Sequence, residues 1–150
     1  MKLLKTVEEV RLYELTAQEG SLLMQLLRHF PFSGLKPATI SQRRDEQTAE
    51  RELLLNESLK QHREELKRAA AAIAARITPS RRSYSLELDP ANREVLMQIM
   101  NDIRVGAWQA LGEPETFEVD PSQLSSNEQA QWQLMHLADF FEVGLIESES

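Results

Sequence analysis

Two segments of this 150-residue chain repeat each other at an offset of 73 residues, which brings Thr16 into register with Asp89. In each segment a short stretch of alternating apolar residues precedes a helix-capping residue, and an amphipathic helical pattern follows. Thr16 forms a capping-box sequence with Glu19, and Asp89 is followed by Pro90 at the first helical position. The repeat therefore predicts two similar strand–helix units around a long middle segment.

Helical patterns recur along the whole chain, and they cover residues 17–30, 48–77, 90–111 and 126–146. The alternating stretches near residues 10–15 and 84–88 are short enough to form single strands. We therefore predict a mainly α fold, a bundle of about four helices with a minimal two-stranded sheet. One domain is expected to span residues 1–150, with frayed ends at about 1–6 and 147–150.

The middle helix carries a narrow apolar seam in steps of four and three residues. Such a seam fits packing on the chain's own domain, and it also fits an intermolecular coiled coil. Both alternatives stay open from the sequence. The seam consists of Leu55, Leu59, His62, Leu66, Ala69 and Ile73.

Composition excludes several chemistries. The chain has no cysteine, so disulfides, thiolate metal sites and thiol nucleophiles are ruled out, and a reducing compartment is favoured. The first residues lack an apolar segment of signal-peptide length, and the longest apolar run, Ala69–Ala75, is too short to cross a membrane. We expect a cytoplasmic protein with no membrane partner.

Charge is distributed unevenly along the chain. Residues 1–42 carry a net charge of +1, residues 43–82 carry +3, and residues 83–150 carry −11. An acidic last third repels phosphate backbones, so we expect no nucleic-acid partner. DNA binding through residues 43–82 is the remaining nucleic-acid alternative, and it would require a steep salt dependence.

No motif assigns a catalytic residue. The sequence has no Gly-x-Ser-x-Gly turn, no P-loop and no dinucleotide-binding fingerprint, and its five glycines are isolated. Among the three histidines, His136 is followed by two acidic residues at three-residue steps, Asp139 and Glu142. A histidine on a packing surface explains this pattern more simply than a metal does, so we expect no catalytic residue, metal or cofactor.

The polar cluster Asn101, Asp102 and Arg104 lies within the third helical pattern. Arg104 falls in the apolar sector of that helix, so its guanidinium must find an acceptor. Asp139 or Glu142 of the last helix is the expected partner. This group is interpreted as an internal arginine–carboxylate clamp, with a ligand-binding arginine as the alternative.

The last helical pattern is apolar on two sides. One side contains the expected core residues of the helix, and the opposite side contains Trp132, His136, Phe140 and Val143. A helix with two apolar sides is either central in a bundle or has a second partner. We predict that these four residues form an interaction face.

Residues 96–107, LMQIMNDIRVGA, and residues 132–141, WQLMHLADFF, resemble a bacterial protein family of unknown function. Members of that family are often encoded beside the Clp protease adaptor that recognises N-terminal residues. The order of elements is similar across most of the chain. In that family a second arginine near a glycine usually follows the Asn-Asp-x-Arg segment, and residues 105–109 here lack it. The resemblance implies a shared fold and a cytoplasmic location, and no activity.

These features together favour a non-enzymatic interaction or adaptor-like module, linked through the resemblance to regulated proteolysis. Its expected partner is another protein or a second copy, and one arrangement is a homodimer through the last helix. The alternative is a small-molecule sensor or enzyme that uses Arg104 and the acids of the last helix in a pocket between helices.

Overall fold

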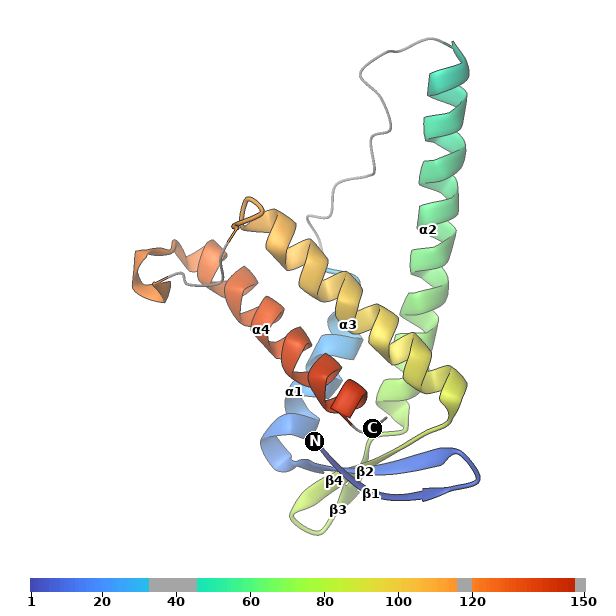
Figure 1. The fold of residues 1–150 in the computed structure, drawn as a ribbon, viewed down its shortest axis with the longest axis vertical. Helices are drawn as coiled ribbons and strands as arrows, with labels where there is room; N and C mark the ends of the chain where they lie inside the picture. The colour runs from blue at the N-terminus through green and yellow to red at the C-terminus, as the bar shows by residue number, and fades with distance from the viewer. Residues whose placement is uncertain (33–45, 116–119, 148–150) are drawn as a thin grey trace.

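A computed structural model describes residues 1–32, 46–115 and 120–147 of the chain (Figure 1). These residues form four α-helices, one short 3-10 helix and one four-stranded sheet. The elements in chain order are β1 (Lys2–Val7), β2 (Val10–Thr16), α1 (Ala17–His29), α2 (Glu46–Ala75), β3 (Thr78–Ser80), β4 (Ser83–Leu88), α3 (Pro90–Ala110), η1 (Pro121–Gln123) and α4 (Ser126–Glu147).

The prediction of a mainly α fold with a two-stranded sheet is wrong. The sheet has four antiparallel strands in the order β1-β2-β4-β3, so the fold is a largely helical mixture of α and β. Each strand–helix unit begins with a β-hairpin. The start of the chain was expected to be frayed, but residues 2–6 belong to strand β1. The far end, residues 148–150, lies outside the described residues.

Both hairpins close through two-residue turns that contain neither glycine nor asparagine. Glu8 and Glu9 have φ angles of 50° and 70°, and Arg81 in the second turn has a φ angle of 44°. Hairpins of this length require left-handed backbone, which Asn-Gly or Gly-containing pairs usually supply. The turns therefore carried no recognisable sequence signal, and the flanking strands β1 and β3 were missed.

The repeat has a direct structural counterpart at the centre of the sheet. Strands β2 and β4 pair in antiparallel fashion, and Tyr13 lies opposite Leu86. These two residues also correspond to each other in the 73-residue repeat, so the two β-hairpin–helix units meet about an approximate two-fold axis at this pair. The predicted strands at residues 10–15 and 84–88 therefore lie side by side.

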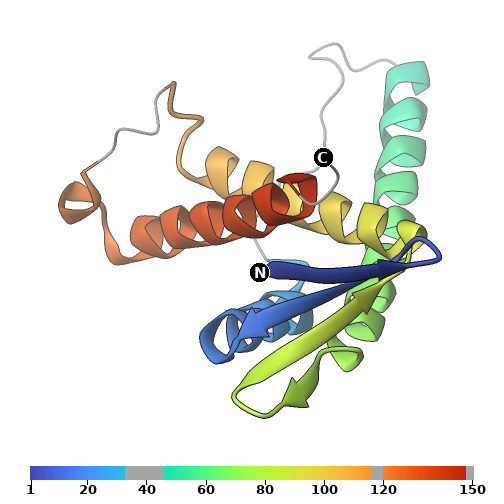
Figure 2. The ribbon, with the colours of Figure 1, turned by 60° about the horizontal axis from the view of Figure 1, so that its bottom comes forward.

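All four helices lie on one side of the sheet (Figure 2). The inward side chains of the central strands, Tyr13 and Leu15 on β2 and Leu86 and Leu88 on β4, are fully buried beneath them. Of the alternate residues of these strands, Glu14 and Glu87 are exposed, and Leu12 and Ser85 are half-buried. This alternation is typical of an antiparallel sheet with one face on the core and one face in solvent.

Helix α2 extends well beyond the other described helices and the sheet (Figure 1). Its buried residues begin only at Leu66 and continue with Ala70, Ile73 and Ala74. Of the predicted seam, Leu66 and Ile73 are buried in the chain's own core, whereas Leu59 and His62 are exposed. The C-terminal third of α2 thus belongs to the core, and its N-terminal part has no buried residue between Gln47 and Glu65.

Candidate functional site

Helix α4 is held against α3 by its inner face. Its start is stabilised by a capping box, in which the Glu128 amide donates to Ser125 Oγ and the Ser125 amide donates to Glu128 Oε1, both at 3.3 Å. The inner face is fully buried and consists of Met135, Ala138, Phe141 and Leu145. Leu134 and Leu137 also pack partly against the core, and the opposite face of α4 projects outward.

The predicted interaction face is only partly exposed. Phe140 and Val143 are exposed at 48% and 41%, and His136 is also exposed. Trp132 is half-buried, and its ring centroid lies 4.1 Å from that of His136 with a 60° angle between the planes. Ile146, one turn beyond Val143, adds a further exposed apolar side chain. We call the exposed set His136, Phe140, Val143 and Ile146 the α4 face.

A groove of about 370 Å³ runs beside the α4 face. Its far wall includes Met1 at the start of the chain, whose ammonium group pairs with Glu19. The other described residues that line it lie on α4, and they are His136, Asp139, Phe140, Val143, Gly144 and Glu147. The surface therefore combines exposed apolar side chains with a neighbouring groove, and the carboxylates of Asp139 and Glu147 make the edge of that groove acidic.

The arginine–carboxylate clamp brings α3 and α4 together. Arg104 Nε donates to Glu142 Oε2 at 3.0 Å, and Arg104 Nη2 donates to Asn101 Oδ1 at 2.9 Å. Glu142 is only 15% exposed, whereas Arg104 is 35% exposed. Asp139, the other predicted partner, instead borders the groove beside the α4 face. Asp102 is half-buried, and its Oδ2 atom has no hydrogen-bond partner among the described residues.

A second recess of about 360 Å³ opens beside Arg104. Trp108 forms part of its wall, and the indole Nε1 donates to the Pro114 carbonyl at 3.0 Å, which holds the ring in place. The wall consists of Arg104, Val105, Trp108, Pro114, Glu115 and Met135. Sequence reasoning missed this recess, although Trp108 lies one helical turn after Arg104 and could have been found from that spacing.

The described residues contain no cluster of three or more side chains suited to hold a metal ion. Within the same residues, no helix is both long and apolar enough to span a membrane. Comparison with protein-family models, curated proteins and solved structures finds no match for this chain.

Proposed function

We propose that this protein is a non-enzymatic interaction module that binds a protein partner through the α4 face. The observation that supports this proposal is the set of Phe140, Val143 and Ile146, which are 41–48% exposed on one helix beside a recess. Clusters of exposed apolar side chains with a polar rim are typical of protein–protein contacts. The sequence resemblance favours a cytoplasmic partner connected with regulated proteolysis.

The test is a double substitution, Phe140→Asp with Val143→Asp, in the full chain. Both side chains are exposed, so the variant should fold, which circular dichroism and thermal unfolding can verify. We expect the wild-type protein to retain partners from a native cell extract that the double variant loses.

The matched control is Val105→Asp, the same chemical change at an exposed apolar position on α3. It leaves the α4 face intact and should retain the same partners as the wild type. Equal capture by all three proteins would contradict the proposal.

A second function is favoured by the recess at Arg104. This recess gathers a partly exposed guanidinium, the Trp108 ring and the Glu115 carboxylate, which suits a small molecule with an apolar body and a polar group. Under this alternative, a ligand from a metabolite screen raises the melting temperature of the wild type and changes Trp108 fluorescence. Val105→Asp should abolish both effects, whereas the Phe140→Asp, Val143→Asp variant should preserve them.

A further inference from the structure

Ten exposed residues occupy one face of α2, opposite the seam. They recur at steps of one and three residues, which keeps them within one sector of a helix with 3.6 residues per turn. All ten are exposed, and two of them are large apolar residues, Leu53 at 62% and Leu54 at 66%. We call this set the α2 face, and it consists of Leu53, Leu54, Glu57, Lys60, Gln61, Glu64, Glu65, Arg68, Ala71 and Ala72.

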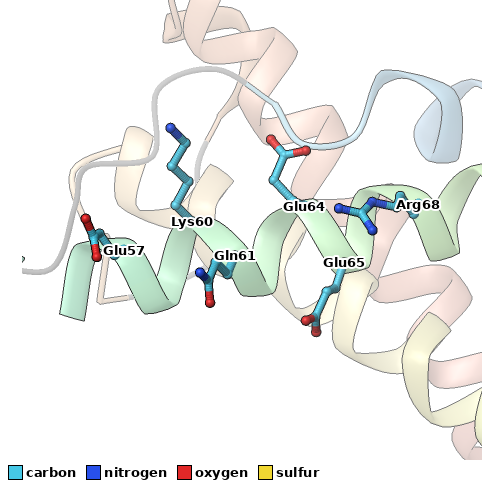
Figure 3. Close-up of a pocket in the computed structure, with 6 residues that line it drawn as sticks. All are labelled: Glu57, Lys60, Gln61, Glu64, Glu65 and Arg68. Atoms are coloured by element: carbon cyan, nitrogen blue, oxygen red, sulfur yellow. The ribbon is translucent and has the colours of Figure 1, made fainter. Parts of the chain in front are cut away.

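The six central residues of the α2 face line an open hollow of about 600 Å³. Figure 3 shows them as sticks along α2, with Lys60 and Glu64 on one edge of the face and Gln61 and Glu65 on the other. Glu57 and Arg68 mark the two ends of this central part. The hollow therefore has opposite charges at its two ends.

The α2 face is self-complementary when a second copy is laid across it in the antiparallel direction. With the midpoint between residues 62 and 63 as the centre, Glu57 lies opposite Arg68 along the middle of the face, and Lys60 lies opposite Glu64 along one edge. Farther out, Leu53 lies opposite Ala71 on one edge and Leu54 lies opposite Ala72 on the other, so a large side chain meets a small one at each end. A two-fold axis repeats each pair, which gives four contacts between opposite charges and four between leucine and alanine.

This pattern is what a two-fold interface between identical chains requires, because residue i must fit residue j while j fits i. We propose that two copies of this chain associate through the α2 faces, with the two helices antiparallel. Most of the stability of a helix in a protein comes from packing, and α2 has no buried residue from Gln47 to Glu65. A second copy would add packing to this part of the helix.

The expected dimer is reversible. From Leu53 to Ala72 the α2 face is about 29 Å long at 1.5 Å per residue, and it is only one helix wide. An interface of this size is at the small end for specific protein complexes. Sedimentation of the wild-type chain should therefore show a mass that rises with concentration. This inference is independent of the α4 face, which lies on another helix.

Charge reversal provides the decisive experiment. Glu57→Lys places a lysine opposite Arg68 at two symmetric positions, and Arg68→Glu places a glutamate opposite Glu57 at two positions. We expect each variant alone to dimerise at least about tenfold more weakly than the wild type, because like charges across an interface are strongly unfavourable. A mixture of the two variants should form heterodimers, because Lys and Arg of one chain then face Glu and Glu of the other.

The matched control is Glu94→Lys, the same charge reversal at an exposed position on α3. This control should dimerise like the wild type, and circular dichroism should show equal helix content in all four proteins. A strictly monomeric wild type at high concentration would overturn the inference. Dimerisation of Glu57→Lys at wild-type strength, or no heterodimer in the mixture, would also overturn it.

Discussion

Gly20 lies in the first turns of α1, directly against the ring of Tyr84 on β4. A Cβ atom at this position would lie 2.3 Å from Tyr84 Cδ2 and 2.6 Å from Cγ, which is too close for any side chain. Alanine is favoured over glycine in helices by about 1 kcal/mol. We nevertheless predict that Gly20→Ala destabilises the protein by about 1–3 kcal/mol, because the overlap forces neighbouring groups apart.

The matched test is a double-mutant cycle measured by urea unfolding. In a Tyr84→Ala background the ring is absent and only the contact with the Cβ atom at 3.0 Å is left, so Gly20→Ala should cost much less stability. An equal loss of stability in both backgrounds would contradict the role of the Gly20–Tyr84 contact.

Arg104 is predicted to stabilise the fold through Glu142. Substitution Arg104→Met leaves the mostly buried Glu142 carboxylate without its cation, which should cost about 1–3 kcal/mol. For a chain of this length the melting temperature should fall by several degrees, at about 2–4 °C per kcal/mol. The double variant Arg104→Met, Glu142→Gln should recover part of the loss, and an unchanged melting temperature in the single variant would contradict the clamp.

Glu19 is predicted to make stability depend on acid pH. Burial alone would raise the pKa of Glu19, but the Met1 ammonium and the amide and hydroxyl of Thr16 favour its charged form, so the pKa lies below the ordinary value of 4.5. A lowered pKa in the folded protein stabilises it above that ordinary value, and the benefit is lost as the pH falls through the folded pKa. Glu19→Gln should therefore be less stable by about 1 kcal/mol near neutral pH.

The measurement is urea unfolding of both proteins at about pH 7 and about pH 3. The difference between them should shrink at the lower pH, where the wild-type carboxyl becomes protonated. A difference that does not change with pH would show that the charge of Glu19 contributes nothing.

At the scale of elements, the first hairpin is predicted to be under strain in its turn. Glu8 and Glu9 both adopt left-handed backbone, which costs about 1–2 kcal/mol for each residue other than glycine or asparagine. Replacing this pair by Asn-Gly should raise stability by roughly 1 kcal/mol or more, measured by thermal unfolding. If β1 were frayed in solution, the substitution would leave the melting temperature unchanged.

The helices were predictable because their signals are local. Thr16 with Glu19 and Asp89 with Pro90 mark helix starts within a few residues, and the structure confirms a helix at each site. Strands β1 and β3 were not predictable because their pairing depends on turns without turn residues. For the Arg104–Glu142 contact, the sequence indicated that the partner of Arg104 is an acid of the last helix. It did not indicate whether that acid is Asp139 or Glu142, and the structure shows Glu142.

At the scale of the whole molecule, stability is expected to be unequal along α2. Its buried core residues are Leu66, Ala70, Ile73 and Ala74, and none of its buried residues precedes Leu66. In dilute solution, hydrogen exchange measured by mass spectrometry should show fast exchange for peptides around residues 50–60 and slow exchange for β2, β4 and the last turns of α2. Uniform protection along all of α2 would contradict this picture.

The sequence by itself determined the four helices and the repeated capping units, because helical period and capping depend on residues within one or two turns of each other. Only the tertiary structure decided that Tyr13 meets Leu86, that Arg104 pairs with Glu142, and that Phe140 is exposed while Phe141 is buried. These outcomes depend on contacts between segments far apart in the chain. A local sequence pattern does not specify which distant segment packs against it.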